Sequence, residues 1–273
     1  MADALMLAGK NALVTGAGRR GGIGAAVATL FAERGANVVL SDYPPVQNDN
    51  VFSSDDRPVQ GDEDGTPKPN GLVEVLRTHG GEVGWLEHNL ALPDSPDTLF
   101  TEALDLLGTI DILVNNAAVS VPSSIDVLNA DLLDRHYAVN LRATALLCAA
   151  FARHYQDGKQ RKAGRIINLT SGQGLGPMPG ELAYAATKGA IDALTTSLSE
   201  ALAPRGITVN AVDPGVTDTG WFGDTERRVF SEQTPMGRVG DVQDAARLIA
   251  FLASDDAGWI TGQIIRSRGG LRG

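Results

Sequence analysis

The sequence has one cysteine, four histidines and no long apolar run, and each shortage excludes a class of site. The single Cys148 excludes a disulfide framework and any zinc or iron–sulfur cage built from several cysteines. The histidines, at His79, His88, His136 and His154, show no metal-ligand spacing. No stretch approaches the ~18 consecutive apolar residues of a membrane-spanning helix. We therefore expect neither a metal site nor a membrane span.

Basic residues are also in deficit. The 23 Lys and Arg against 33 Asp and Glu give a formal net charge of −10. Binding to nucleic acid needs a clustered excess of Lys and Arg, so nucleic acid is not expected as a partner. Residues 1–8 lack the basic start and the apolar stretch of a signal peptide, so we expect a cytoplasmic protein.

Short apolar runs alternate with helical segments along all 273 residues. The expected strands span residues 11–15, 37–41, 82–87, 110–114, 165–169, 207–212 and 263–266. The expected helices span residues 25–34, 72–79, 95–107, 126–155 with a break near Ala130, 184–203 and 241–253. Near-continuous apolar strands between helices are typical of a parallel sheet covered on both faces. We therefore predict one doubly wound α/β domain over residues 1–273, with a seven-stranded parallel sheet.

One polar segment, residues 43–70, interrupts this alternation. It holds five prolines and several acids but few apolar side chains. That composition predicts a solvated, mobile loop inserted after the second strand. The alternative is a flap over whatever binds at the end of that strand.

A glycine-rich turn, from Gly16 to Gly24, lies between the first strand and the first helix. Glycine lets the backbone turn sharply and approach a pyrophosphate closely, and the helix N-terminus behind it adds free N–H groups and a positive dipole end. A purely structural turn is the alternative interpretation. The position after the first strand favours a dinucleotide site.

Asp42 is expected at the end of the second strand, 18 residues after Gly24. A carboxylate there can accept both hydroxyls of an adenosine ribose and repels a 2′-phosphate, which favours NAD. Arg19 and Arg20 in the glycine turn oppose this, because either could pair with a 2′-phosphate, although both could be solvated loop charges. We give Asp42 more weight because the strand fixes its position, so NAD is favoured over NADP.

Tyr184 and Lys188 are four residues apart, a spacing that places both on one face of a helix. A nearby cation stabilises a phenolate and lowers the pKa of a tyrosine toward neutrality, as a general acid/base requires. Ser171 lies 13 residues upstream, at the end of the fifth strand, where its hydroxyl could bind a substrate carbonyl oxygen or serve as a turn residue.

These features and several others occur in one order along the chain. They are Thr15-Gly16 with Gly22-Ile23-Gly24, Asn115-Asn116-Ala117, Asn140 in Val-Asn-Leu, Ser171, Tyr184 with Lys188, Asn210 to Gly215, and Thr261-Gly262. The chain thereby resembles the short-chain dehydrogenase/reductase family, and in particular bacterial members called 3-oxoacyl-carrier-protein reductases. The resemblance implies a single-domain Rossmann-type fold and an NAD(P)-dependent oxidoreductase that acts on a small-molecule carbonyl or alcohol.

The resemblance also implies roles for individual residues. Tyr184 would be the general acid/base, Lys188 would lower its pKa and hold the nicotinamide ribose, Ser171 would orient the substrate oxygen, and Asn140 would hold a water in a proton relay. The remaining cofactor contacts would be Gly16, Gly22, Ile23 and Gly24 at the pyrophosphate, Asn89, Leu90, Asn116 and Ala117 on the adenosine side, and Pro214, Gly215, Thr217 and Thr219 at the nicotinamide. Residues 216–238 would close over the substrate, and the assembly would be a homotetramer.

Three departures from the family pattern bear on these roles. The glycine turn is two residues longer, which leaves the backbone at Arg19 and Arg20 uncertain. Ala118 replaces a glycine, and Arg268 stands where an acidic residue usually precedes Gly269-Gly270. The alternatives are a non-catalytic dinucleotide-binding scaffold or sensor, an NADPH-dependent 3-oxoacyl-thioester reductase, and an enoyl reductase, against which the Tyr184–Lys188 spacing argues. The sequence identifies neither the substrate nor the preferred direction.

Overall fold

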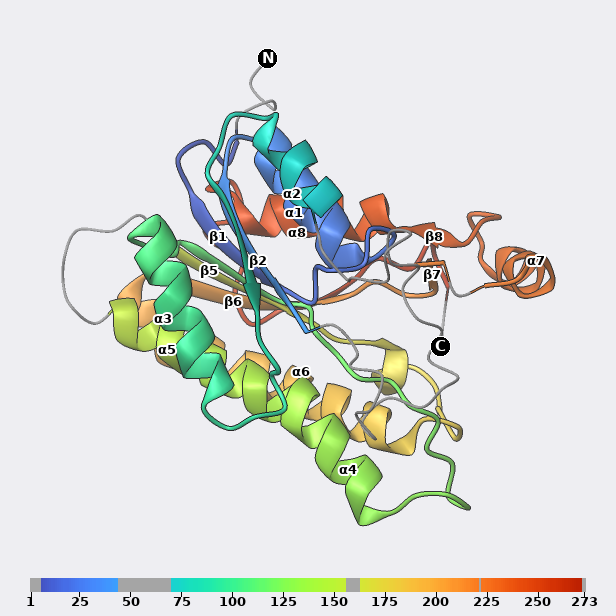
Figure 1. Ribbon diagram of the computed structural model, residues 1–273. Helices are drawn as coiled ribbons and strands as arrows, with labels where there is room; N and C mark the ends of the chain where they lie inside the picture. Colours follow the sequence, from blue (N-terminus) through green and yellow to red (C-terminus); the bar gives the residue numbers. More distant parts are fainter. Residues whose placement is uncertain (1–5, 44–69, 156–162, 221, 272–273) are drawn as a thin grey trace.

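A parallel sheet forms the centre of the molecule (Figure 1). The structure is a computed structural model, and it describes residues 6–43, 70–155, 163–220 and 222–271. The seven strands of the sheet run in the order β3-β2-β1-β4-β5-β6-β9. The strands are β1 (Asn11–Thr15), β2 (Asn37–Asp42), β3 (Val83–Glu87), β4 (Ile112–Asn115), β5 (Gly164–Leu169), β6 (Ile207–Asp213) and β9 (Ile264–Arg266). Every neighbouring pair is parallel. The prediction of a seven-stranded parallel sheet is therefore confirmed.

Helices cover both faces of this sheet (Figure 1). One face carries α1 (Ile23–Glu33), α2 (Asn70–Arg77) and α8 (Val242–Ala253). The other carries α3 (Ser95–Leu107), α4 (Ala130–His136), α5 (Thr144–His154) and α6 (Leu182–Leu202). Short elements complete the described chain: the π-helical η2 (Tyr137–Ala143), the 3-10 turns η4 (Gly172–Gly174) and η5 (Ala203–Arg205), the pair β7 (Thr217–Asp218) and β8 (Gly240–Asp241), and α7 (Asp224–Gln233). No helix within these ranges is both long and apolar enough to cross a bilayer.

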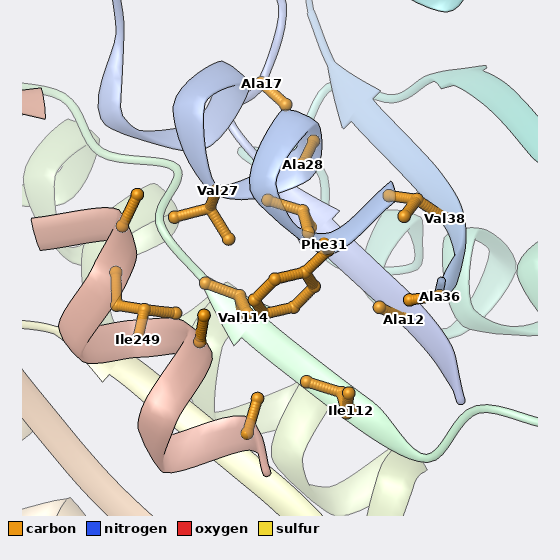
Figure 2. Close-up of a cluster of buried hydrophobic side chains, with 14 of the residues drawn as sticks. Ala12, Ala17, Val27, Ala28, Phe31, Ala36, Val38, Ile112, Val114 and Ile249 are labelled. Atoms are coloured by element: carbon orange, nitrogen blue, oxygen red, sulfur yellow. The ribbon is translucent and has the colours of Figure 1, made fainter. Parts of the chain in front are cut away.

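The central strands are apolar along their length because both faces of the sheet are covered. All residues of β4, β5 and β6 are buried. Between the sheet and α1, the side chain of Phe31 packs beside Val27, Val114 and Ile249 (Figure 2). Burial of this kind is the main favourable term in folding.

Two sequence expectations need correction. The helix expected from residue 126 begins at Ala130, where the side chain of Asn129 caps it by accepting the N–H of Leu132 at 3.0 Å. Its interruption lies further on, in the π-helical turn η2. Residues 216–238, which are expected to close over the substrate, include a ten-residue helix, α7, between β7 and β8. The polar insertion is mostly outside the described residues, since only Tyr43 and Asn70 of it belong to them.

The strand order creates a reversal point between β1 and β4. The chain passes from β1 outward to β2 and β3, and then returns to the other side of β1 as β4, β5 and β6. Because all these strands are parallel, the loops that leave their carboxyl ends lie along one edge of the sheet, where such folds bind ligands. Asp42 ends β2 at this edge, and the glycine turn, Asn116, Ser171 and Pro214 follow strands there.

We predict that Phe31→Ala lowers the free energy of unfolding by about 3–5 kcal/mol, because Phe31 is fully buried and its removal leaves a cavity between α1 and the sheet. Phe251→Ala on α8 is the matched control. Phe251 is 37% exposed, so we expect a loss below about 1 kcal/mol. Urea titrations followed by circular dichroism measure both values, and equal losses would contradict the assignment of Phe31 to the core.

Candidate active site

A cavity of about 410 Å³ lies at the carboxyl edge of the sheet, across the reversal point. Its walls come from the loops after β1, β2, β3, β4, β5 and β6 and from α6. The predicted site residues that line it are Gly16, Arg19, Gly22, Ile23, Asp42, Asn89, Leu90, Asn116, Ala117, Tyr184, Lys188, Pro214 and Thr219. The structure thus brings together side chains that are up to about two hundred residues apart in the sequence.

The glycine turn is packed too closely for side chains at Gly16, Gly18 and Gly24. A Cβ on Gly24 would lie 2.5 Å from the carbonyl oxygen of Gly16, and a Cβ on Gly16 would lie 2.6 Å from Cα of Ala117. Asn116 supports the turn by donating from Nδ2 to the carbonyl oxygens of Thr15 and Gly16, at 2.9 and 2.8 Å. The turn is therefore held against the loop after β4 by its backbone.

The first turn of α1 follows this glycine turn. Its N-cap residue is Gly22, so no side chain satisfies the helix's first N–H groups. Gly22 and Ile23 both line the cavity. Free N–H groups and the positive end of the helix dipole suit a phosphate group at this point.

Asp42 lies at the end of β2 and lines the cavity. Its Oδ2 accepts the N–H of Gly18 at 2.6 Å, and its Oδ1 accepts the N–H of Tyr43 at 2.7 Å. Burial raises the pKa of Asp42, and the two N–H groups and the charge of Arg19 oppose that rise. Each carboxylate oxygen keeps acceptor capacity for a ligand hydroxyl.

The two arginines of the glycine turn differ in position. Arg19 lines the cavity and interacts electrostatically with Asp42. Arg20 is exposed, and its guanidinium lies against Gly71 at the start of α2. Of the two cations, only Arg19 belongs to the cavity wall.

Tyr184 and Lys188 share one face of α6, as the sequence predicts. Nζ of Lys188 lies 5.4 Å from the centre of the Tyr184 ring and donates to the carbonyl oxygen of Leu169 at 2.7 Å. Both side chains line the cavity, at the end of β5. A hydrogen bond from Ser171 to Tyr184 joins the third group of the predicted set to them.

The pKa of Tyr184 moves in the direction opposite to the sequence expectation. Burial raises it to about 12, the hydrogen bond of Ser171 lowers it, and the charges of Glu181 and Asp213 raise it further. Burial also lowers the pKa of Lys188 to about 8, against the charge of Asp192. Burial favours the neutral form of both groups, so at neutral pH Tyr184 is a protonated phenol.

Asn140 lies in η2 and does not line the cavity. Its Oδ1 accepts the N–H of Val119 at 2.7 Å, and its Nδ2 donates to the carbonyl oxygen of Val119 at 2.9 Å and to the hydroxyl of Thr187 at 3.1 Å. Because Val119 lies in the loop after β4 and Thr187 lies in α6 next to Lys188, Asn140 connects that loop to α6. The relay role that the resemblance implies for it stays a prediction.

Six predicted site residues do not line the cavity, and seven residues that line it were not predicted. Those outside the wall are Arg20, Gly24, Asn140, Ser171, Gly215 and Thr217. Those not predicted are Tyr43, His88, Ala118, Val119, Val139, Leu169 and Thr170. Tyr43 adjoins the predicted contact Asp42, and His88 adjoins the predicted contact Asn89, so extending each predicted contact by one residue along the chain would have found them. Val119 and Val139 carry no such signal, because any apolar residue suits a cavity wall.

Comparison with known proteins identifies the family. Residues 65–272 match the family described as enoyl-(acyl carrier protein) reductase. A short chain dehydrogenase from Burkholderia cenocepacia, solved in complex with NADP, superposes with a TM-score of 0.81 at 30% identity and covers 97% of this chain and 99% of that one. An uncharacterized oxidoreductase of Bacillus subtilis is 46% identical over 262 residues, which cover 96% of both chains. The chain belongs to the short-chain dehydrogenase/reductase family.

The similarity extends to a bacterial 3-oxoacyl-carrier-protein reductase. The enzyme of that name from Staphylococcus epidermidis is 35% identical over 265 residues, covering 96% of this chain and 98% of that protein. As a member of the dehydrogenase/reductase family, the chain is an NAD(P)-dependent oxidoreductase.

We predict that Gly24→Ala weakens dinucleotide binding at least about tenfold, because a methyl group there displaces the backbone that faces the phosphates. Gly21→Ala in the same turn is the matched control, since its nearest neighbour would lie at an ordinary 3.7 Å. Isothermal titration with NADH measures both affinities. Wild-type binding by Gly24→Ala would show that the turn does not hold the pyrophosphate.

Proposed function

We propose that this dehydrogenase/reductase transfers a hydride between NAD(H) and a ketone or secondary alcohol, with Tyr184 as general acid/base. The observation that carries the proposal is that Tyr184 and Lys188 line the cavity on the β5 side of the reversal point and that Ser171 hydrogen-bonds to Tyr184. Asp42 lies on the β2 side of that point. This arrangement suits an extended dinucleotide with its adenosine toward β2 and its reactive end toward Tyr184.

The residues present fit such a dinucleotide. Gly16, Gly22, Ile23 and Gly24, with the uncapped start of α1, would face the pyrophosphate. Asp42, Asn89, Leu90, Asn116 and Ala117 would hold the adenosine side, and Pro214, Gly215, Thr217 and Thr219 would meet the nicotinamide end. The bound nicotinamide supplies or accepts the hydride.

The side chains around Tyr184 would manage the proton. As a neutral phenol, Tyr184 is in the form that protonates a carbonyl oxygen during reduction. Ser171 would orient that oxygen, while Lys188 would hold the nicotinamide ribose and Asn140 would connect Lys188 to solvent through a water. In the opposite direction, Tyr184 would act as the base.

Two other activities fit the chain less well. A non-catalytic scaffold or sensor does not need Asn140, Ser171, Tyr184 and Lys188 together. Enoyl reduction, the activity in the description of the matching family, is disfavoured by the four-residue spacing of Tyr184 and Lys188. Reduction of a 3-oxoacyl thioester remains one case of the proposed carbonyl chemistry, and residues 216–238, which include α7, would cover the substrate and select it.

We predict that Tyr184→Phe lowers turnover at least about 10²-fold, because it removes the proton donor and keeps the ring. Affinity for NADH should stay close to that of the wild type. Tyr137→Phe, a substitution at a tyrosine that is 49% exposed, is the control and should leave turnover unchanged. Nicotinamide absorbance with a ketone substrate gives the rates, and normal turnover by Tyr184→Phe would remove Tyr184 from the mechanism.

The choice between NAD and NADP depends on Asp42 and Arg19. The carboxylate of Asp42 can accept the ribose hydroxyls of NAD, whereas a 2′-phosphate there would meet a like charge, at a cost of several kcal/mol even at an effective dielectric constant of about 20. Arg19 offsets part of that repulsion. The related structure from Burkholderia cenocepacia contains NADP, so the preference for NAD rests on this chain's own Asp42.

We predict that NADH binds at least about tenfold tighter than NADPH, a difference of about 1.4 kcal/mol. Asp42→Ala should narrow the difference by improving NADPH binding, and Arg19→Gln should widen it. Because burial raises the pKa of Asp42, the carboxylate becomes neutral at a higher pH than an ordinary aspartate, so the preference should shrink as the pH falls. Fluorescence titrations test this, and equal wild-type affinities at neutral pH would show that Arg19 dominates.

A further inference from the structure

A buried ion pair lies beneath the two loops that carry the catalytic Ser171 and the cofactor-facing Pro214. Asp213 is the last residue of β6 and is 1% exposed. Its Oδ2 lies 3.6 Å from Nε of Arg268, whose side chain is 13% exposed. The sequence identifies Arg268 as a departure from the family pattern, and the structure places an aspartate opposite it.

The side chain of Arg268 fills the space between two glycines. A Cβ on Gly172 would lie 2.9 Å from Nη2 of Arg268, and a Cβ on Gly215 would lie 2.8 Å from its Cγ. Gly172 directly follows Ser171, and Gly215 directly follows Pro214. Arg268 therefore contacts both loops of the site from below, and each glycine makes room for it.

Asp213 connects the same loops to the end of the sheet. Its Oδ1 accepts the N–H of Gly215 at 2.9 Å, and its carbonyl oxygen accepts the N–H of Ser267 at 2.8 Å. Within the described chain, Oδ2 of Asp213 and Nε and Nη1 of Arg268 are buried without a hydrogen-bond partner. Each charge is thus compensated mainly by the other, and removal of one leaves the other buried and unpaired.

We propose that Asp213 and Arg268 form a positioning pair, which holds the Ser171 and Pro214 loops in register and balances a buried negative charge next to Tyr184. This inference rests on the proposed function for its catalytic part. Its structural part requires only the contacts of Arg268 with Gly172 and Gly215.

Several charges act on the site together with this pair. Asp213 and Glu181 both raise the pKa of Tyr184, and Asp213 also raises the pKa of Asp192. Around Tyr184 and Asp213, the other charged groups that interact with one another are Glu181 at the N-cap of α6, Lys188 and Asp192 on α6, and Arg266 on β9. A cation beside Asp213 offsets its effect on Tyr184, so the two members of the pair should act on Tyr184 in opposite directions.

The first test measures how the rate of alcohol oxidation depends on pH. We expect this rate to rise with pH, because Tyr184 then becomes an effective base. Arg268→Met removes the cation and should move the profile to higher pH by about 0.5 unit or more. Asp213→Asn keeps the acceptor for Gly215, removes the negative charge and should move the profile to lower pH. The double variant should return toward the wild-type profile. Unchanged profiles, or shifts in the same direction in both single variants, would overturn the charge-balancing role.

The second test needs no substrate. In Arg268→Met, amide hydrogen exchange should become faster in residues 170–176 and 214–217, and Arg268→Lys should keep part of the protection. Arg247→Met is the control. Arg247 and Arg268 both line a second cavity, at the end of β9, but the side chain of Arg247 is 64% exposed and bridges to Asp244. Wild-type protection of both loops in Arg268→Met would show that the pair does not hold the two loops in position. Absence of any turnover in the wild type would instead contradict the proposed function. The exchange result would still show whether Arg268 holds the two loops.

Discussion

The parallel direction of the strands is the constraint on which the site depends. It sends every strand's carboxyl end to one edge of the sheet, and the reversal between β1 and β4 opens that edge. The register of β1 with both neighbours, Val14 opposite Leu40 and Val114, then aligns the glycine turn with Asp42 on one side and with Asn116 on the other. Apolar strands buried on both faces hold this register, since a slip would misplace side chains that pack against two helical layers.

Burial at this edge controls the chemistry as much as the identity of the side chains does. It raises the pKa of Tyr184 and lowers that of Lys188, in each case because burial disfavours the charged form. Charges that enter or leave the site then have large effects, because the surroundings screen them weakly. The ion pair of Asp213 and Arg268 lies in the same environment, which explains why a pair without a close hydrogen bond can still position two loops.

The sequence predicts the architecture because its signals are local. Apolar runs bounded by turns identify the seven strands of the sheet, and glycine spacing with Asp42 identifies the dinucleotide side. Contacts between residues far apart in the sequence are not predicted in this way. The sequence predicts that Lys188 lies near Tyr184, but it does not predict the burial of the site, and burial raises the pKa of Tyr184 where a lower pKa was expected. The sequence identifies Arg268 as unusual, but it does not predict that Arg268 pairs with Asp213 on β6. The π-helical turn at Asn140 depends on packing, because Ala138, Asn140 and Ala143 in it are buried. The substrate and a homotetramer stay predictions.

The proposed dinucleotide would lie in one cavity, with its ends on opposite sides of the reversal point. A crystal structure of the complex with NADH would show whether it does. We expect the adenosine ribose hydroxyls within hydrogen-bond distance of Asp42, the pyrophosphate over the start of α1, and the nicotinamide next to Tyr184 and Pro214. A dinucleotide bound with its adenine next to Tyr184, or bound outside this cavity, would rule out this arrangement.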